Sequence, residues 1–423
     1  RPRRPSRRLD RWGEMSEQKR ILIMTADAGF GHRSAANALA AAFKDAYAEQ
    51  CLVEVVNPLD DPAAPGFLRD SQVNYDDLVR TMPDIYKLNY TISDSVVSAA
   101  VMDRALTVMM VRVVRHYLKN FQPSVVISTH PFYMSPLSSY LSLTKNKTPF
   151  VTVATDLTNV HRLWFNTGAN LLVLPTDEAH QQGVEIGFPD ANMQVTGIPV
   201  NPVFANEKRS KDEIRAELGW APGMPTALVM GSKRIKGLME TMHVLNHSGL
   251  HVQFVLVAGG DDELYEQFKS TEWHHAVHIY NFVDTMPTFM RAADLVIGKA
   301  GGLSVTESMA AGLPLLISDV TPGQEEGNAA YVVEHGVGDR AEDPLAALEC
   351  LFHWLDRDHA LLNERAQKAC ALGRACSAYD IAALALQVAE QGYAPAKPGL
   401  AEQATKLKEL LKTFDISLSE KHL

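Results

Sequence analysis

The stretch DLVIGKAGGLSVTESMAAGLPLLIS, residues 294–318, determines the fold class of this chain. It begins with a short apolar run and turns at a pair of glycines. It then continues as an amphipathic segment of helical length and ends in a second apolar run. Two strands joined by a helix form a parallel pair, because the crossover returns the second strand in the same direction. The stretch therefore predicts a β-α-β unit.

The same alternation of strand and helix extends over both halves of the chain. Nearly continuous apolar runs are typical of parallel strands covered by helices on both faces. We therefore expect an α/β protein with two doubly wound domains that face each other across a cleft at their carboxyl-terminal strand edges. The expected strands are ILIMT (21–25), CLVEVV (51–56), SVVIS (124–128), FVTVAT (150–155), LLVL (171–174), TALVM (226–230), VQFVLVA (252–258), VHIY (277–280), DLVI (294–297) and LPLLIS (313–318).

The domain boundary is expected in GIPVNPVFANEKRSKDEI (197–214), which has two prolines followed by polar and charged residues, as a linker would. This divides the chain into an N-terminal domain (15–200) and a C-terminal domain (201–380). Residues 381–423 are expected to form a helical segment that packs partly on the N-terminal domain, with a Lys-rich amphipathic helix over 401–423.

Residues 1–14 form a basic tail with six arginines and two acidic residues. One interpretation is that the coding start lies at Met15 and that the tail is an artefact of a start assigned too early. The other is that the tail holds anionic lipid, at roughly 1 kcal/mol per basic side chain.

Composition excludes several classes of protein. The 423 residues have a net charge of −10 and a pI near 5.8, which disfavours a general nucleic-acid binder. The four cysteines include no C-x-x-C pair, which favours a reducing compartment over disulfides or structural zinc. No uncharged apolar run reaches the roughly 18 residues of a spanning helix, so an integral channel or transporter is not expected.

The stretch VVSAAVMDRALTVMMVRVV (96–114) is rich in valine and methionine and has two interpretations. It is either a helix of the core or an apolar surface that receives a lipid acceptor. The interspersed Arg104 and Arg112, with Arg115 just beyond, add basic contacts. On the second interpretation the N-terminal domain binds anionic membranes peripherally.

The first candidate site is the turn ADAGFGHRS (26–34), directly after strand 21–25. Gly29 and Gly31 are expected to permit tight geometry between the strand and the next helix, whose N-terminus points to the cleft. The turn lacks both the dinucleotide-binding pattern and the G-K-[ST] of a P-loop. His32 at its mouth is either a capping side chain or a general base.

The second candidate site lies between Lys299 and Gly336. The adjacent Gly301 and Gly302 let backbone amides approach a phosphate at a helix N-terminus. A carboxylate one turn into that helix, Glu307, can accept both hydroxyls of a ribose, and Gln324 with Glu325 can accept hydroxyls of a sugar. These are the contacts that a nucleotide-sugar needs.

Other chemistries find less support. Two groups of three histidines lie close together in the sequence, namely His243, His247 and His251, and His274, His275 and His278. Neither group has a carboxylate or cysteine at ligand spacing, so no metal site is expected. No G-x-S-x-G motif is present, which disfavours an α/β-hydrolase.

Three stretches carry a family resemblance: GFGHRSAANAL (29–39), TVATDLTNVHRLWF (152–165) with the linker region 171–204, and KAGGLSVTESMAAGLPLLISDVTPGQEEGNAAYVVEHGVG (299–338). Together they resemble monogalactosyldiacylglycerol synthases and processive diacylglycerol glucosyltransferases, of glycosyltransferase family 28 type. More distantly, the chain is similar to the peptidoglycan N-acetylglucosaminyl transferase. The resemblance spans about residues 21–390. It implies a GT-B fold and a metal-independent, cofactor-free, inverting transfer from UDP-galactose or UDP-glucose to diacylglycerol.

The resemblance also implies roles for single residues. His32 is expected to be the catalytic base, with Asp156 orienting or replacing it. The donor contacts are expected from Phe282 and Val283 at uracil, Glu307 at ribose, Gly301, Gly302 and Ser304 at the diphosphate, and Gln324, Glu325 and Asn328 at the sugar, with Gly31 on the other side of the cleft. One departure concerns MGSKRIKG (230–237), which replaces a glycine-rich loop; Gly231, Ser232 and Lys233 are expected to contact the donor there.

The expected product is a β-glycosyldiacylglycerol made at the inner face of the cell membrane by a cytoplasmic, peripherally associated enzyme, with no nucleic-acid partner. Two alternatives stay open. One is a UDP-sugar-dependent transferase with another lipid-linked acceptor. The other, motivated by the altered 230–237 loop, is a nucleotide-sugar-binding protein without turnover.

Overall fold

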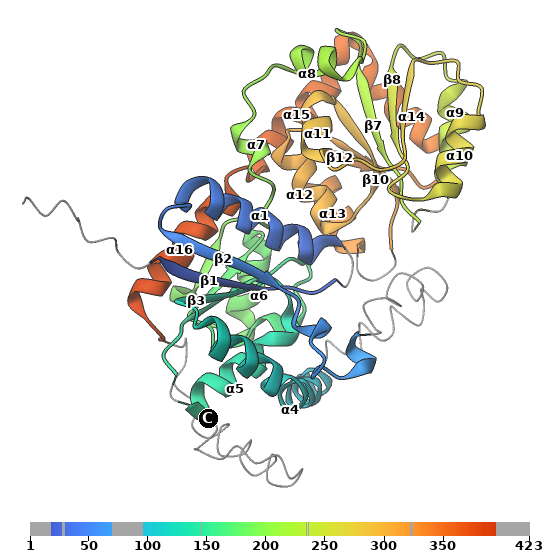
Figure 1. The fold of residues 1–423 in the computed structure, drawn as a ribbon. Coiled ribbons are helices and arrows are strands. Elements are labelled where there is room, and N and C mark those ends of the chain that lie inside the picture. Colours follow the sequence, from blue (N-terminus) through green and yellow to red (C-terminus); the bar gives the residue numbers. More distant parts are fainter. Residues whose placement is uncertain are drawn as a thin grey trace, which may run out of the picture.

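A computed structural model describes residues 18–27, 30–69, 96–144, 146–233, 235, 237–321 and 325–394. The basic tail 1–14 and the helix expected over 401–423 lie outside these ranges and stay predictions. Within the described residues, the strands form two six-stranded parallel sheets, in the orders β2-β1-β3-β4-β5-β6 and β12-β11-β10-β7-β8-β9. Figure 1 shows one sheet in each of two domains, which confirms the predicted doubly wound architecture.

The predicted strands are all present, and their ends differ from the expected ones by at most two residues. The N-terminal domain contains β1 (Lys19–Met24), β2 (Cys51–Val56), β3 (Val125–Ser128), β4 (Phe150–Val153), β5 (Leu171–Leu174), β6 (Met193–Val195), α1 (Phe30–Tyr47), α4 (Val96–Phe121), α5 (Met134–Thr144), α6 (Asp177–Ile186) and α16 (Ser377–Gln391). The C-terminal domain contains β7 (Thr226–Met230), β8 (Gln253–Val257), β9 (Val277–Tyr280), β10 (Leu295–Lys299), β11 (Leu315–Asp319), β12 (Gly338–Arg340), α7 (Val203–Asn206), α8 (Lys211–Leu218), α9 (Leu238–Asn246), α10 (Asp262–Ser270), α11 (Met286–Ala292), α12 (Gly302–Ala310), α13 (Glu326–Glu334), α14 (Pro344–Leu355) and α15 (Ala360–Leu372).

Each sheet is covered on both faces, because successive side chains of a strand point to opposite sides. In β1, Leu22 and Met24 pack toward α4 and α5, whereas Ile21 and Ile23 pack toward α1 and α16. The strands of the second sheet divide their side chains in the same way, between α8, α11 and α12 on one face and α9 and α14 on the other. The central strands of each sheet are therefore buried along most of their length, whereas the edge strands stay partly exposed.

Helix α4 decides between the two interpretations of residues 96–114. From Leu106 onward most of its apolar side chains, including Met110 and Val114, are buried against α5 and the sheet. The core interpretation is therefore right for this part, and an apolar lipid-binding surface there is wrong. The side chains of residues 96–102 lie outside the described ones. The exposed face of α4 instead carries Arg104, Arg112 and Lys119.

The chain crosses between the domains twice, once between β6 and α7 and once between α15 and α16. The two crossings lie side by side, because Ser377 Oγ donates to the carbonyl oxygen of Ile198 at 2.9 Å and accepts from Val200 N–H at 3.2 Å. Gly197 has φ +89°, and a β-carbon there would lie 2.8 Å from Arg374 Cβ, so this turn requires glycine.

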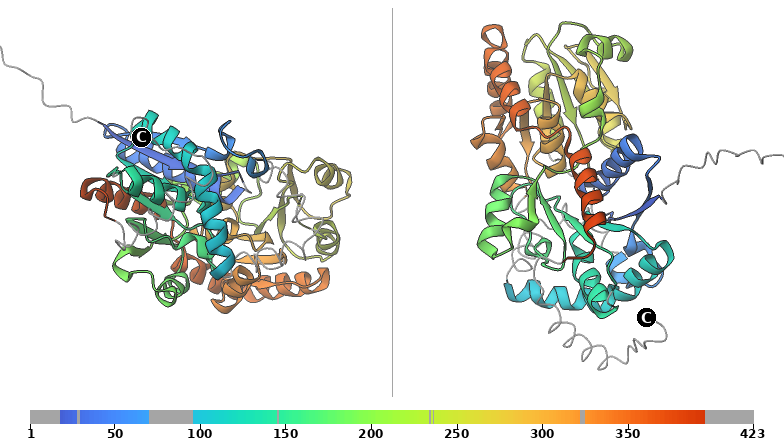
Figure 2. Two further views of the ribbon diagram at one scale, coloured as in Figure 1. Left: turned by 90° about the horizontal axis from the view of Figure 1, so that it is seen from below. Right: turned by 90° about the vertical axis from the view of Figure 1, so that its left-hand side faces the viewer.

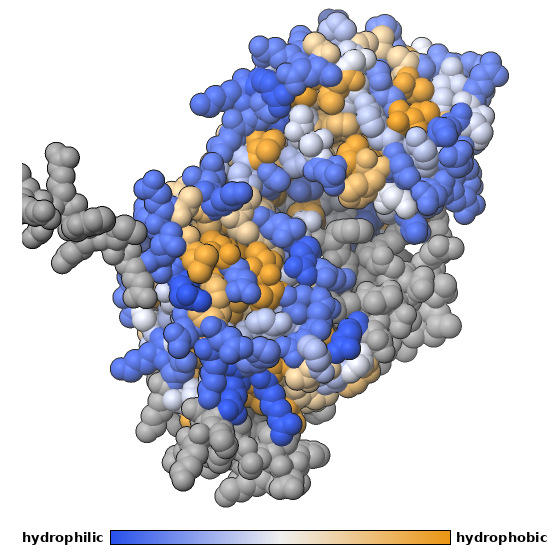
Figure 3. All heavy atoms as spheres, viewed as in Figure 1, coloured by the Kyte–Doolittle hydropathy of each residue, from blue (hydrophilic) through white to orange (hydrophobic). Residues whose placement is uncertain are grey.

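Helix α16 returns to the N-terminal domain and lies beside α1 (Figures 1 and 2). By length and composition alone, residues Arg357–Gln391 are apolar enough to cross a membrane. In the fold this segment is divided into α15 and α16, and the apolar face of α16 is buried, with Ile381 and Ala385 fully inaccessible. Hydrophilic residues dominate the face shown in Figure 3, where the visible apolar residues form separate patches.

Candidate functional site

His32 lies in the first turn of α1, above the carboxyl ends of three neighbouring strands. The strand order β1-β3-β4 brings together the segments that follow these strands, although β1 ends 104 residues before β3 does in the chain. His32 Nδ1 lies 2.9 Å from the carbonyl oxygen of Thr129 and 2.7 Å from Thr155 Oγ1. Thr129 Oγ1 donates in turn to the carbonyl oxygen of His32 at 3.1 Å. His32 is thus held by hydrogen bonds to its ring and to its backbone.

These contacts assign the tautomer of His32. A carbonyl oxygen only accepts, so Nδ1 carries the proton and shares it with the two oxygens, which leaves the lone pair on Nε2. Burial lowers the pKa of His32 below its ordinary value, although the negative charge of Asp156 acts in the opposite direction. The ring is therefore neutral near pH 7, with Nε2 available to accept a proton.

A second histidine, His130, stands edge-on to His32, with ring centroids 4.6 Å apart. Its Nδ1 accepts the backbone N–H of Phe132 at 3.4 Å at the start of the short helix Pro131–Tyr133. Burial lowers the pKa of His130 well below the ordinary value. His130 thus places a second neutral ring against His32. Sequence reasoning missed His130 and Thr129, although their position directly after strand 124–128 was a usable signal.

Asp156 follows β4 and is oriented by two donors. Its Oδ2 accepts the indole N–H of Trp164 at 2.8 Å and the backbone N–H of His161 at 3.2 Å. Trp164 is 1% exposed, so this donor is fixed by packing. The indole ring lies 6.2 Å from the His32 ring. The structure therefore brings the two predicted catalytic residues to one edge of the sheet and adds Trp164, which the sequence did not single out.

Gly31 does not have the backbone role expected of it. It lies within α1, its φ is not positive, and a β-carbon there would meet nothing within 4 Å. Neither a tight turn nor packing requires glycine at this position. Gly29 lies outside the described residues.

The opposite wall of the cleft begins where β10 ends. Gly301 is the N-cap of α12, with φ −65° and ψ 138°, and no side chain caps this helix end. The first N–H groups of α12, from Gly302 to Ser304, are therefore oriented to bind an anion. Gly302 also faces the other domain, because a β-carbon there would lie 3.5 Å from the carbonyl oxygen of Thr155. Only a small residue leaves room for a ligand at this point.

Glu307 lies on α12, one turn after Ser304. Burial raises the pKa of its carboxyl from 4.5 to about 7. A carboxylate is costly in a desolvated place unless hydroxyls or cations supply hydrogen bonds. This position therefore favours a ligand with adjacent hydroxyl groups.

Glu325 caps the start of α13 and forms a buried ion pair that sequence reasoning missed. Its Oε1 accepts from Lys299 Nζ at 2.5 Å, and its Oε2 accepts the backbone N–H of Thr321 at 2.9 Å. The side chains of Lys299 and Glu325 are 20% and 6% exposed. Lys299 is the last residue of β10, and its place at a strand end next to two glycines was the available signal. Gln324, expected beside Glu325, lies outside the described residues.

Asn328 joins the two domains. Its Nδ2 donates to the carbonyl oxygen of Ala300 at 3.0 Å, and its Oδ1 accepts from Thr158 Oγ1 at 3.2 Å. The neighbouring Gly327 approaches the same loop so closely that a β-carbon would lie 2.5 Å from Thr158 Oγ1. Both polar ends of the Asn328 side chain are thus engaged in holding the two walls together.

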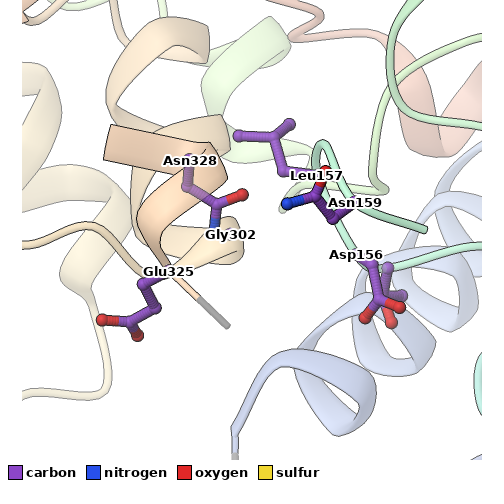
Figure 4. A pocket seen from close by; sticks show the side chains of 7 residues that line it. Asp156, Leu157, Asn159, Gly302, Glu325 and Asn328 are labelled. Atoms are coloured by element: carbon purple, nitrogen blue, oxygen red, sulfur yellow. The ribbon is translucent and has the colours of Figure 1, made fainter. Parts of the chain in front are cut away.

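A pocket lies between these walls (Figure 4). It is lined by Thr155, Asp156, Leu157 and Asn159 of the N-terminal domain and by Gly302, Glu325 and Asn328 of the C-terminal domain. Figure 4 shows Asp156 and Glu325 on opposite sides of the pocket. Among the described residues, no three His, Cys, Asp or Glu side chains are grouped to hold a metal ion.

The end of the site expected for the base of the nucleotide is formed after β7, β8 and β9. Phe282 is 60% exposed, whereas Val283 packs against the core, so only the phenylalanine is free to stack on a ligand. Gly231 meets the turn after β8, where a β-carbon at Gly259 would lie 2.2 Å from the Gly231 carbonyl oxygen. Gly259 and Gly260 have φ +67° and +80°. This second glycine turn, missed in the sequence, lies beside the altered 230–237 loop.

Lys233 is exposed and Ser232 is partly buried. Arg234 and Lys236 lie outside the described residues.

Comparisons with known proteins show which families and folds this chain is similar to. The family model of monogalactosyldiacylglycerol (MGDG) synthase matches residues 32–200, and that of the glycosyltransferase family 28 C-terminal domain matches residues 229–369. The chain is 31% identical over 379 residues to a probable chloroplastic monogalactosyldiacylglycerol synthase of Glycine max, covering 87% of this chain and 71% of that protein. It is 30% identical over 351 residues to the chloroplastic monogalactosyldiacylglycerol synthase of Spinacia oleracea, covering 81% of this chain and 67% of that protein.

Among solved structures, the chain is similar in fold to MurG of Acinetobacter baumannii. The TM-score is 0.56 at 15% identity, with 87% of this chain and 99% of that one covered. This likeness, with the two facing parallel sheets, shows the GT-B fold of glycosyltransferases.

Proposed function

The chain belongs to the monogalactosyldiacylglycerol synthase family, and on this premise we propose that it transfers galactose from UDP-galactose to diacylglycerol with inversion at the anomeric carbon. The coarser conclusion, a glycosyltransferase with the GT-B fold, follows from the family and the fold. The donor, the acceptor and the stereochemistry are the proposal.

In the proposed reaction, His32 Nε2 takes the proton from the free hydroxyl of the glycerol. The hydroxyl oxygen then attacks the anomeric carbon while the bond from that carbon to the β-phosphate oxygen breaks, and its electron pair leaves with UDP. The contact of His32 Nδ1 with the Thr129 carbonyl oxygen supports this role, because it keeps Nε2 unprotonated. Asp156 stabilises the imidazolium that forms, as its attraction for the charged ring indicates.

The leaving diphosphate needs fixed positive charge or oriented N–H groups. The N-terminus of α12, which has no side-chain cap, supports this role, because its first residue, Gly302, lines the pocket between the domains. Glu307 is proposed at the ribose, Phe282 at the uracil and Glu325 at the sugar hydroxyls. We propose that these protein groups suffice without a metal or another cofactor, and turnover in the presence of EDTA tests this point.

The observation that carries the proposal is the two-sided pocket, with Asp156 on one wall and Glu325 on the other. Inverting transfer needs the base and the leaving group on opposite sides of the anomeric carbon. A site with a neutral histidine on one domain and an anion-binding helix end on the other meets that requirement.

The decisive experiment supplies UDP-galactose and UDP-glucose, each with diacylglycerol vesicles, and measures both UDP release and the labelled lipid. We expect a β-galactosyldiacylglycerol with anomeric configuration assigned by NMR. Labelling of a different lipid from a total extract would replace diacylglycerol as the acceptor. UDP binding without UDP release would leave a nucleotide-sugar-binding protein, and an α-linked product would refute the single displacement.

We also propose that the enzyme works at the cytoplasmic face of a membrane containing anionic lipid. The outer face of α4 supports this. Arg104, Arg112 and Lys119 lie on one side of this helix, each about two turns after the previous one, in an otherwise acidic chain. Since most apolar side chains from Leu106 onward are buried, the contact is expected to be electrostatic and to weaken as salt rises.

Vesicle flotation tests this attachment. The triple charge reversal Arg104→Glu, Arg112→Glu, Lys119→Glu should abolish flotation with anionic vesicles at low salt. Reversal of Lys269 and Lys368 in the other domain, both exposed, is the matched control and should leave it unchanged. If the triple variant floats with the vesicles as wild type does, α4 is not the membrane contact.

A further inference from the structure

The ion pair between Lys299 and Glu325 is largely buried beside the helix end at which the proposed function places the diphosphate. Lys299 Nζ and Glu325 Oε1 are 2.5 Å apart, and a β-carbon on Gly301 would lie 3.5 Å from each of them. The pair therefore touches the turn that opens α12. Glu325 also lines the pocket between the domains.

A diphosphate at this helix end meets a carboxylate of its own sign, and this contact is unfavourable unless the lysine changes partner. Two like charges at such distances repel strongly in a partly desolvated site. An ammonium on a flexible four-carbon stem can move from a carboxylate to a phosphate oxygen, because both are acceptors of the same charge. Glu325 does not need to move with it, since its second oxygen is held by the Thr321 backbone N–H at 2.9 Å.

We propose that Lys299 exchanges Glu325 for the diphosphate of the donor when the nucleotide-sugar binds, and returns to Glu325 when UDP leaves. This inference deepens the proposed function and rests on it. In the bound state the ammonium contacts the phosphate oxygen that receives the electron pair as the glycosidic bond to the β-phosphate breaks. The freed carboxylate oxygen of Glu325 then accepts a hydroxyl of the sugar.

The exchange makes Glu325 a competitor of the diphosphate. With UDP alone, the protein loses the ion pair and gains only a diphosphate contact. With UDP-hexose, the released carboxylate gains a sugar hydroxyl. The carboxylate therefore weakens binding of the product UDP relative to the donor, which favours release after transfer.

Calorimetric titration of uridine, UDP and UDP-galactose separates the contributions of the diphosphate and of the sugar to binding, without requiring turnover. Lys299→Met should lower UDP affinity by about tenfold or more, the value of a lost charge-assisted hydrogen bond, and leave uridine affinity unchanged. Glu325→Gln should raise UDP affinity severalfold, and the gain should be smaller for UDP-galactose. Lys269→Met, in an exposed pair with Glu266, is the matched control and should change none of the three affinities.

The double variant Lys299→Met, Glu325→Gln distinguishes exchange from simple repulsion. Under exchange, Glu325→Gln improves UDP binding more in the wild-type background than in Lys299→Met, because only the wild type has an ion pair to break. Repulsion alone gives at least as large an improvement when Lys299 is absent, because no cation then shields the carboxylate from the diphosphate. Equal UDP affinity of wild type and Lys299→Met, with Lys299→Met folded by circular dichroism, would overturn the exchange while leaving the proposed function intact. Failure of the wild type to bind UDP at all would instead contradict the proposed function. If Lys299→Met folds poorly, Lys299→Arg is the second variant to measure. It keeps the positive charge and should therefore retain part of the UDP affinity.

Discussion

Replacing Glu307 by glutamine should stabilise the protein and weaken its binding of UDP. Burial raises the pKa of this carboxyl from 4.5 to about 7. Each unit of pKa shift corresponds to about 1.4 kcal/mol, so ionising the folded carboxyl costs about 3 kcal/mol relative to the unfolded chain. Glutamine has nearly the same shape and no charge to desolvate. A binding residue that destabilises the ligand-free fold is a common compromise between function and stability.

The pH dependence gives the sign of the effect. A carboxyl whose pKa is raised in the fold contributes stability that is fully present below the unfolded value of 4.5 and is lost as the pH rises to about 7. Between pH 5 and pH 8 the advantage of Glu307→Gln over wild type should therefore grow by about 2–3 kcal/mol. Titrations common to both proteins cancel in this difference.

Urea unfolding of the ligand-free proteins at pH 5, 6, 7 and 8, followed through the transition of the C-terminal domain, measures this difference. Glu364→Gln is the matched control. Its carboxyl is exposed and accepts from Lys368, which lowers its pKa, so its difference should not grow in the same direction. A Glu307→Gln difference that stays constant from pH 5 to pH 8 would refute the reasoning.

UDP binding supplies the functional half of this prediction. If Glu307 accepts the ribose hydroxyls as a carboxylate, Glu307→Gln should lower UDP affinity by about tenfold. Wild-type affinity should fall as the pH drops below about 7, and this dependence should be absent in the variant. Unchanged affinity in Glu307→Gln would remove this residue from the donor site.

Three further predictions concern the N-terminal wall and the contact between the domains. His32→Ala should lower kcat by about 10²–10⁴-fold with UDP affinity unchanged. If only Asp156→Asn lowers kcat to this extent, Asp156 is the base instead of His32. If the double variant has the same kcat as either single variant, the two residues act together in one catalytic step. Trp164→Phe removes the indole N–H that Asp156 accepts at 2.8 Å, so kcat should fall by about tenfold and its pH profile should shift, while UDP affinity stays constant. Gly327→Ala places a β-carbon 2.5 Å from Thr158 Oγ1 and should break the hydrogen bond from Thr158 to Asn328. Small-angle scattering should then report a more open arrangement of the domains, because this hydrogen bond joins the two walls of the pocket. The melting temperature should change little, because the added methyl lies between the domains and not in the core of either one.

Sequence patterns predicted the strands well because burial on both faces requires unbroken apolar runs. Two strands were missed, β6 with the residues MQV and β12 with GDR. Each is a three-residue strand at a sheet edge, where only one neighbour supplies hydrogen bonds and burial is incomplete. Such strands carry no apolar run for a pattern to detect.

The valine- and methionine-rich stretch 96–114 shows a different limit. Its composition fits a core helix and a lipid-binding surface equally well, since both need apolar side chains. The packing of α4 against α5 buries Met110 and Val114 and leaves Arg104 and Arg112 outside. Which face of a helix is covered depends on its neighbours, and no local pattern contains that information.

The sequence by itself determined the α/β class, the positions of the strand ends and the motifs that place the chain in its family. Those properties depend on local periodicity and on short spacings. It also singled out His32, Glu307 and Glu325 from their places in the turns and helices that follow strand ends, and Asp156 from the family resemblance. The tertiary structure alone decided how these residues act. The contact of His32 Nδ1 with Thr129 joins residues 97 positions apart, and the Lys299–Glu325 pair spans 26 positions. Tautomer, pKa and charge pairing arise from such through-space contacts, which form only once parallel strands bring distant segments to one edge.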